Sequence, residues 1–158
     1  MRRLKWPLLA GVAVLGAAFL GGTAQAESWG APSREFARYG IRTIVCDERP
    51  HGAPCLGLAC RNGALALVSA SGGGGPMDGL TRVSTGQGAF TLNFAFDPRA
   101  VDRLGVAAAS ASLTAAQIDK LLAATLLILT SQADASIRHR FTTRGLASEW
   151  RRVATACR

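Results

Sequence analysis

Apolar and polar residues alternate along several short stretches of the chain, which is the pattern of strands with one buried face. The clearest two stretches are 55–60 and 64–68, and an Asn-Gly pair at 62–63 lies between them. Asn-Gly between alternating stretches is the strongest short-range signal for a hairpin, because both residues tolerate the positive φ of a tight turn. Period-two alternation places Cys60 on the same face as the two leucines of the first stretch. The sequence therefore predicts a central hairpin with Cys60 on its covered face.

Similar stretches lie on both sides of this hairpin. We expect further strands at 36–46, 80–84, 89–96, 106–111, 125–130 and 136–142. In the third of these, four apolar residues share one face, namely Phe90, Leu92, Phe94 and Phe96. The glycine-rich segment 69–76 predicts a flexible surface loop, because no lysine and hydroxyl of a phosphate-binding loop follow it.

Two helices are expected in the second half of the chain. Thr114 and Gln117 have the spacing of a capping box, which predicts a helix that starts there. The apolar run 121–129 suits a helix or a buried strand, and periodicity does not decide between them. We interpret it as a short helix near 114–123 and then a strand.

A closing helix near 145–157 is indicated by apolar residues that are four, three and four positions apart. They lie on one helical stripe, and they are Leu146, Trp150, Val153 and Cys157. The predicted fold class is therefore α+β, mostly an antiparallel β-sheet, with these two helices and two disulfides.

The first 26 residues have the organisation of a secretory signal peptide. A positive segment at 1–5 precedes an apolar segment at 8–20, and a small-x-small tripeptide at 24–26 follows directly. A membrane anchor is the alternative, but the apolar segment is short and glycines interrupt it. We expect cleavage after residue 26, a flexible mature N-terminus at 27–35 and one domain at 36–158, in the periplasm or secreted.

The four cysteines, Cys46, Cys55, Cys60 and Cys157, all lie beyond the predicted cleavage site. An even number in a small exported domain predicts two disulfides, for which three pairings are possible. Cys46 and Cys55 bracket a turn region between two strands, and Cys60 and Cys157 are both expected to face the core. We therefore favour the pairs Cys46–Cys55 and Cys60–Cys157.

The chain is basic, with a formal net charge of +8, of which about +5 remains once the three basic residues of the signal peptide are removed. Such a charge permits contact with anionic lipid headgroups, acidic glycans or acidic proteins. Nucleic acid is not expected, because the compartment is wrong and aromatic residues do not interleave with the basic ones. Five arginines near the C-terminus form one anion- or partner-binding patch if the last strand and helix are neighbours, and a solvated basic face otherwise. They are Arg138, Arg140, Arg144, Arg151 and Arg152.

Residues for catalysis are few. His51 and His139 are the only histidines, and the chain has no Gly-x-Ser-x-Gly nucleophile motif. The cysteines lack the Cys-x-x-Cys spacing of redox sites, and with His51 they have awkward intervals for zinc. We expect no catalytic residue, metal or cofactor. A deep polar pocket that holds a histidine beside an acid would instead favour an enzyme.

Three stretches carry a resemblance to a known family: 42–46, 55–60, and 144–150 with the cysteine at 157. The chain resembles small α-proteobacterial periplasmic proteins related to the invasion-associated locus B family. Its end is also similar to the C-terminal stretch of secretion-associated periplasmic proteins, where a Gly-Leu turn precedes a last helix and a cysteine. The resemblance implies a β-rich, disulfide-linked envelope protein without known catalytic residues, and it assigns no site.

These observations together predict an exported, non-enzymatic binding or interaction protein of the cell envelope. Its partner is expected to be a protein or an anionic envelope component, with no membrane span after signal cleavage. An inhibitor or a secretion accessory factor is the alternative, and a hydrolase is the weakest hypothesis.

Overall fold

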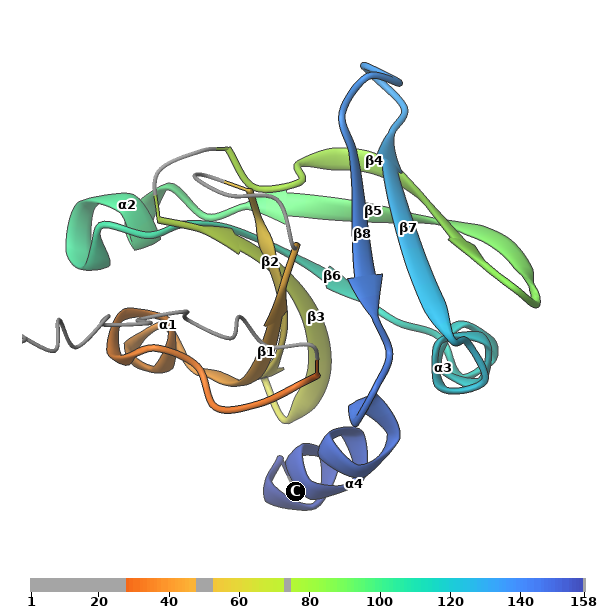
Figure 1. Cartoon of the computed structure of the whole chain (residues 1–158). Helices are drawn as coiled ribbons and strands as arrows, with labels where there is room; N and C mark the ends of the chain where they lie inside the picture. Colours follow the sequence, from red (N-terminus) through yellow and green to blue (C-terminus); the bar gives the residue numbers. More distant parts are fainter. Residues whose placement is uncertain (1–27, 48–52, 73–74, 158) are drawn as a thin grey trace, which may run out of the picture.

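The computed structural model describes residues 28–47, 53–72 and 75–157. Within these residues the chain forms an antiparallel sheet of eight strands with four helices (Figure 1). The strands are β1 (Ile41–Cys46), β2 (Cys55–Arg61), β3 (Ala64–Ser71), β4 (Gly79–Thr85), β5 (Gly88–Phe96), β6 (Ala107–Ser112), β7 (Leu126–Ser131) and β8 (Arg138–Thr142). Their order in the sheet is β1-β2-β3-β6-β5-β4-β7-β8. The predicted α+β fold with a mostly antiparallel sheet is confirmed.

The central hairpin has the predicted two-residue turn. Arg61 of β2 pairs with Ala64 of β3, and the turn residues Asn62 and Gly63 have φ of 52° and 75°. These values lie in the left-handed region, which Asn and Gly tolerate better than other residues. The hairpin of β4 and β5 and the strands β6, β7 and β8 also form within a few residues of their predicted positions.

Two apolar clusters form on opposite faces of β1, β2 and β3. The larger core lies inside the curved sheet, where Leu58 of β2, Phe94 of β5 and Phe141 of β8 are almost fully buried. The smaller cluster, which includes Ile41 and Val68, lies on the other face. Two helices cover that face, α1 (Arg34–Arg38) and α2 (Pro98–Leu104), and Figure 1 shows them together on one side of the molecule. The strands of the central hairpin are therefore covered on both faces.

Both predicted disulfides are confirmed. Cys46 and Cys55 lie directly opposite each other on β1 and β2, with their Cα atoms 3.9 Å apart. Cys60, near the far end of β2, is bonded to Cys157 at the end of α4 (Leu146–Ala156), with Cα atoms 5.5 Å apart. The two bonds therefore fix both ends of β2.

The closing helix α4 buries the predicted stripe. Leu146, Trp150 and Val153 are 2%, 8% and 0% exposed, and they pack in the larger core. The helix α3 (Ala115–Leu122) begins with both hydrogen bonds of the predicted capping box. The Thr114 hydroxyl accepts the Gln117 N–H, and the Gln117 side chain accepts the Thr114 N–H. The apolar run 121–129 is divided between the end of α3 and the strand β7, as we interpreted it.

The start of the domain differs from the prediction in two ways. Residues 36–38 belong to α1, and the first strand begins at Ile41, because Gly40 turns the chain with φ of +94° between them. In the segment expected to be flexible at 27–35, Trp29 is 5% exposed and Gly30 exchanges backbone hydrogen bonds with Ile44, whereas residues 31 and 33–35 are exposed. Residues 1–27, and with them the predicted signal peptide, lie outside the described residues.

The loop predicted at 69–76 starts later than expected. Ser69, Ala70 and Ser71 continue β3, because all three pair with β6 and the first two also pair with the start of β2. The Ser69 hydroxyl is buried and accepts the N–H of Met77 at 2.8 Å. Glycines 73 and 74 lie outside the described residues, as does most of the predicted turn at 47–54.

Helix α2 was not predicted, although its boundary signals are present. Asp97 caps it by accepting the Arg99 N–H at 3.0 Å, proline follows the cap, and Gly105 ends the helix with φ of 65°. The inward face predicted for β5 was wrong at its last residue. Phe96 is 42% exposed, at the end of β5 where the strand leaves β4 and pairs with β6. Within the described residues no helix has the length and apolar character needed to cross a membrane.

Candidate binding site

The two outermost strands of the sheet, β1 and β8, come together through side-chain and backbone contacts. Asp47, directly after β1, is 5% exposed, and its Oδ2 accepts the backbone N–H of Arg140 on β8 at 3.3 Å. The same oxygen lies 2.9 Å from Nδ1 of His139. One buried carboxylate therefore links β1 to the middle of β8.

A second link lies at the other end of β8. The indole N–H of Trp29 donates to the carbonyl of Thr142, and the backbone N–H of Trp29 donates to the carbonyl of Arg144, both at 2.9 Å. Its neighbour Gly30 pairs with Ile44 of β1 through two backbone hydrogen bonds. The short segment 29–30 therefore bridges β1 and the end of β8.

The outward face of β7 and β8 combines aliphatic and basic side chains. The register places Ile128 opposite Arg140 and Leu126 opposite Thr142, and Arg138 lies two residues before Arg140 on the same face. On the inward face of the two strands, Leu127, Leu129 and Phe141 are buried. The strands are therefore held by their inward residues, while the outward residues can contact a ligand.

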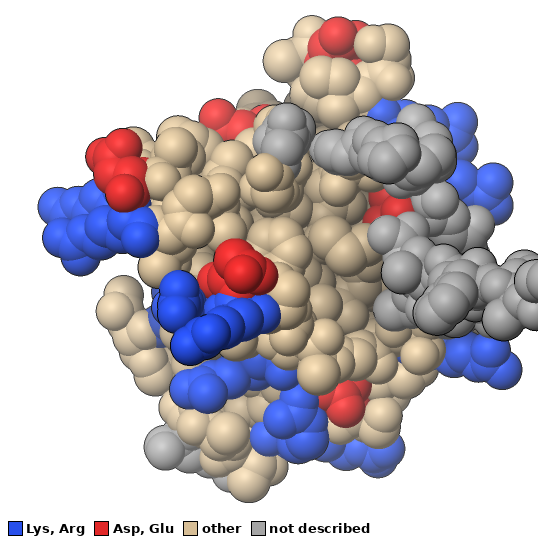
Figure 2. Space-filling model, turned by 60° about the vertical axis from the view of Figure 1, so that its left-hand side comes forward, with Lys and Arg blue, Asp and Glu red and all other residues tan. Residues whose placement is uncertain are grey.

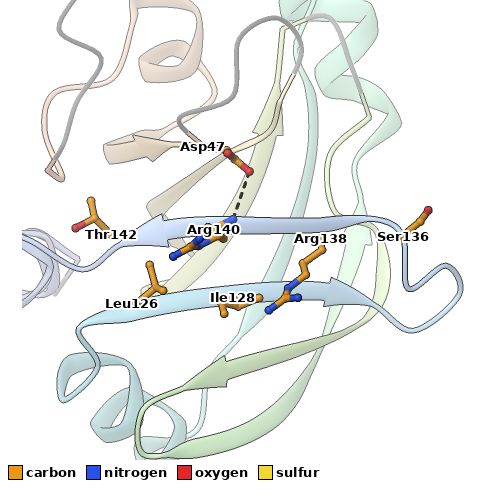
Figure 3. Close-up of a pocket in the computed structure, with 7 residues that line it drawn as sticks. All are labelled: Asp47, Leu126, Ile128, Ser136, Arg138, Arg140 and Thr142. Carbon is orange, nitrogen blue, oxygen red and sulfur yellow. Dashed lines mark hydrogen bonds between the residues drawn. The ribbon is translucent and has the colours of Figure 1, made fainter.

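A cavity of about 870 Å³ lies over this outward face. It is lined by Asp47, Leu126, Ile128, Ser136, Arg138, Arg140 and Thr142. Figure 3 shows Leu126 and Ile128 on β7 beside Arg138, Arg140 and Thr142 on β8, with Asp47 bonded to Arg140 from across the edge. Arg138 and Arg140 are both exposed, and the two aliphatic residues are half-buried. We call this set of lining residues the β7–β8 surface.

The five arginines that were expected to form one patch if the last strand and helix were neighbours divide into groups. Arg138 and Arg140 line the β7–β8 surface, and Arg144 follows β8 in the connection to α4. Arg151 and Arg152 lie on α4, which packs against β1, β2 and β3, and neither lines this cavity. Figure 2 likewise shows Lys and Arg side chains at several separate places, with smaller areas of Asp and Glu among them.

Arg152 is engaged within the protein. It forms an ion pair with Glu149 one turn earlier, with the closest contact at 2.6 Å, and it donates to the carbonyl of Arg42 at 3.0 Å. The hydrogen bond from Arg152 lowers the pKa of Glu149. Arg152 therefore contributes to the attachment of α4 rather than to a ligand site.

His139 lies beside an acid, but it does not line the cavity. Its ring is on the opposite face of β8 from the two arginines, with its centroid 6.4 Å from that of Phe141. A carboxylate that contacts Nδ1 can orient an imidazole for acid–base catalysis. Here the same carboxylate also accepts a backbone N–H, so the pair joins β1 to β8. His51 lies outside the described residues.

Other reactive groups are placed as follows. All four cysteines are in disulfides, so the protein in this form has no thiol nucleophile. Among residues 28–47, 53–72 and 75–157, no three His, Cys, Asp or Glu side chains gather where they could hold a metal ion. The arrangement on β7 and β8 can instead hold an anionic group against guanidinium groups.

Comparison with protein-family models, curated proteins and solved structures finds no match to the chain. The resemblance to proteins related to the invasion-associated locus B family therefore stays a prediction.

Sequence reasoning found the two arginines of the β7–β8 surface and placed Ser136 and Thr142 on the same strand face, but it missed the residues contributed by other elements. Leu126 and Ile128 were seen only as part of an apolar run, and the outward position of their side chains follows from the pairing of β7 with β8. Asp47 was interpreted as part of a polar turn, and Trp29 as part of a loose terminus. Their partners are 92 or more positions away in the chain, so no local pattern could reveal them.

Proposed function

We propose that this chain is an exported, non-catalytic binding protein of the cell envelope, and that the β7–β8 surface holds an anionic envelope component. The observation that carries the proposal is the pair of exposed arginines, Arg138 and Arg140, over half-buried aliphatic residues in one cavity. The signal-peptide pattern at 1–26 and the two disulfides support export, since disulfides persist in oxidising compartments.

The charged part of the surface suits a phosphate or carboxylate group. A guanidinium group presents a planar set of donors that can bind such an anion through two parallel hydrogen bonds. Residues two apart on one strand project from the same face, so Arg138 and Arg140 can contact one group or two adjacent ones. The Arg140 guanidinium forms no ion pair within the described part of the chain.

The aliphatic part favours a ligand with a hydrocarbon portion. Leu126 and Ile128 retain exposed apolar area on the outward face, directly across from the arginine strand. Apolar area that contacts a ligand gains about 25 cal/mol per Å² removed from water. An anionic lipid headgroup with its first methylene groups satisfies both parts of the surface, and a free inorganic anion satisfies only one.

Vesicle binding tests this function. The mature protein is sedimented with vesicles of phosphatidylglycerol and phosphatidylcholine at low salt, beside the double variant Arg138→Gln/Arg140→Gln. Each basic residue near an anionic membrane contributes about 1 kcal/mol, so losing two is expected to weaken binding roughly thirtyfold. Vesicles of phosphatidylcholine alone are expected to bind weakly.

The matched control removes the same charge elsewhere. Arg42 on β1 and Arg151 on α4 are exposed, and neither lines this cavity. Arg42→Gln/Arg151→Gln is expected to weaken binding severalfold less than the β7–β8 variant. Equal losses in the two variants would show that only net charge matters, and the proposed surface would then be rejected.

Export is tested separately by mass spectrometry of the protein isolated from its native cells. Cleavage after Ala26 is expected, so that Glu27 is the first residue. A chain that retains residues 1–26 would contradict the predicted signal peptide.

A further inference from the structure

A second cavity, of about 400 Å³, lies where α1, the end of β2 and α2 meet. Four arginines from these three elements line it, namely Arg38, Arg61, Arg99 and Arg103, together with Tyr39 and Asp97. Sequence reasoning assigned none of these residues to a site, because α1 and α2 were not predicted. We call this cavity the α1–α2 pocket.

Arg61 is held in a fixed position in the α1–α2 pocket. Its guanidinium carbon lies 4.3 Å from the centroid of the Tyr39 ring, and Nη2 donates to the carbonyl of Tyr39 at 3.0 Å. The adjacent Gly40 leaves room for it, since a Cβ there would lie 3.2 Å from Nη1 of Arg61. A cation over an aromatic face gains roughly 0.5–2 kcal/mol, and the planar group is thereby oriented before any ligand arrives.

Tyr39 is itself held by Asp97. The Tyr39 hydroxyl donates to Oδ2 of Asp97 at 3.2 Å, and Oδ1 of Asp97 accepts the backbone N–H of Arg99 at 3.0 Å. Tyr39 is 8% exposed, and its burial, with the nearby Asp97, raises the pKa of its hydroxyl. One oxygen of the carboxylate thus links Tyr39, at the end of α1, to α2, and the other caps α2. No described arginine forms an ion pair with this carboxylate, so the arginine side chains can contact another anion.

The charge in the α1–α2 pocket is unbalanced. Arg99 and Arg103 lie one turn apart on the same side of α2, and Arg38 is the last residue of α1. All three are exposed, and none forms an ion pair with any residue that the structure describes. Four guanidinium groups and one carboxylate leave an excess of three positive charges. Figure 2, which brings the α1 and α2 side forward, shows basic surface exceeding acidic surface there.

Like charges that are gathered in a concave site repel one another unless an anion lies between them. We propose that the α1–α2 pocket binds a small phosphate-bearing anion, with Arg61 as the fixed contact and Arg38, Arg99 and Arg103 around it. A group with two or three negative charges matches the excess charge, and guanidinium groups fit phosphate oxygens in pairs. The volume suits a small ligand rather than a peptide segment. This site lies apart from the β7–β8 surface and shares no lining residue with it.

Calorimetric titration with inorganic pyrophosphate tests the proposal, using the mature, disulfide-bonded protein at low salt. The double variant Arg99→Gln/Arg103→Gln is expected to lose at least tenfold in affinity. The control Arg42→Gln/Arg151→Gln removes the same charge away from the α1–α2 pocket and is expected to change affinity less than threefold. Arg38→Gln, on the other helix, provides an independent variant with an expected loss of severalfold.

Two results would overturn the proposal: no pyrophosphate binding by the wild-type protein at low salt, or equal losses in the double variant and the control. A second arm measures phosphatidylglycerol vesicle binding by the same proteins and identifies the source of the phosphate. If Arg99→Gln/Arg103→Gln loses pyrophosphate binding alone, the ligand is a soluble anion. If it loses both, the α1–α2 pocket takes a lipid headgroup, and in either case it is a phosphate site.

Discussion

Strand β2 and strand β8 lie in the same sheet but are held in different ways. β2 has a neighbour on each side, an apolar cluster on each face and a disulfide at each end. β8 pairs with β7 alone, packs with one face only, and is joined to β1 by Asp47 and the segment 29–30 rather than by a ladder. Covalent and packing constraints are concentrated around β2, while β8 presents a face to solvent. The fold thus separates the part that maintains the structure from the part proposed to bind.

The largest difference is expected when the long disulfide is removed. The Cys60–Cys157 bond spans 97 positions and the Cys46–Cys55 bond spans 9. The chain-entropy model assigns about 4.7 kcal/mol to the first and about 2.6 kcal/mol to the second. Cys60→Ala/Cys157→Ala is therefore expected to lower the free energy of unfolding more than Cys46→Ala/Cys55→Ala does. Urea denaturation of both proteins measures the difference, and a larger loss in the second would contradict it.

A smaller effect is expected when the link between β1 and β8 is cut. Asp47→Ala removes a buried acceptor from the Arg140 N–H and from His139, which is expected to cost about 2 kcal/mol. The exposed Asp119→Ala on α3 provides a control that should change stability by less than about 0.5 kcal/mol.

Hydrogen exchange shows where the loss of Asp47 acts. Faster exchange is expected at 138–142, with little change at 55–61 under conditions that favour the folded state. Uniformly faster exchange through both strands would mean that β8 and β2 open together, and the contrast between them would be lost.

Aliphatic truncations on β2 and on β7, the neighbour of β8, sharpen the same contrast. Leu58 on β2 is 0% exposed, so Leu58→Ala is expected to cost about 2–5 kcal/mol. Ile128→Ala, on the outward face of β7, is expected to cost about 1 kcal/mol but to weaken vesicle binding severalfold. Thermal denaturation and vesicle sedimentation give the two quantities. A stability loss at Ile128 as large as that at Leu58 would mean that the outward face is structural.

The smallest effect concerns the ion pair on α4. The Arg152 hydrogen bond lowers the pKa of Glu149 in the folded protein, so the pair stabilises the fold above the unfolded-state pKa, and this is lost as pH falls through the lowered value. Both side chains are partly exposed, so Glu149→Gln is expected to cost less than about 1 kcal/mol at pH 7. Unfolding free energies at pH 7 and at about pH 3 should show the gap between the two proteins closing with acid. A gap that widens at low pH would contradict the assignment.

Features specified by nearby residues were predictable from the sequence. The turn at 62–63, the capping box at Thr114 and the stripe of α4 each depend on spacing within a few positions. The cysteine pairing was also predictable, because Cys46 and Cys55 bracket a turn between two strands, and Cys60 and Cys157 lie on apolar faces of a strand and a helix.

Features that depend on distant partners were not predictable. Trp29 stands in a polar segment and is buried because the end of β8 lies beside it. The α1–α2 pocket requires two short helices and the end of β2 to converge, although the cap and glycine around α2 were visible in the sequence. The five arginines were expected to form one patch if the last strand and helix were neighbours, and they are divided, since α4 packs on β1, β2 and β3.

Hydrogen–deuterium exchange with phosphatidylglycerol vesicles tests most directly whether the β7–β8 surface is the binding face. The protein is compared with and without vesicles at low salt, with disulfides intact. Slower exchange is expected in peptides that cover 126–131 and 138–142, with exchange at 55–71 unchanged. Protection that is absent from the β7 and β8 peptides, or that occurs only elsewhere in the chain, would contradict this account.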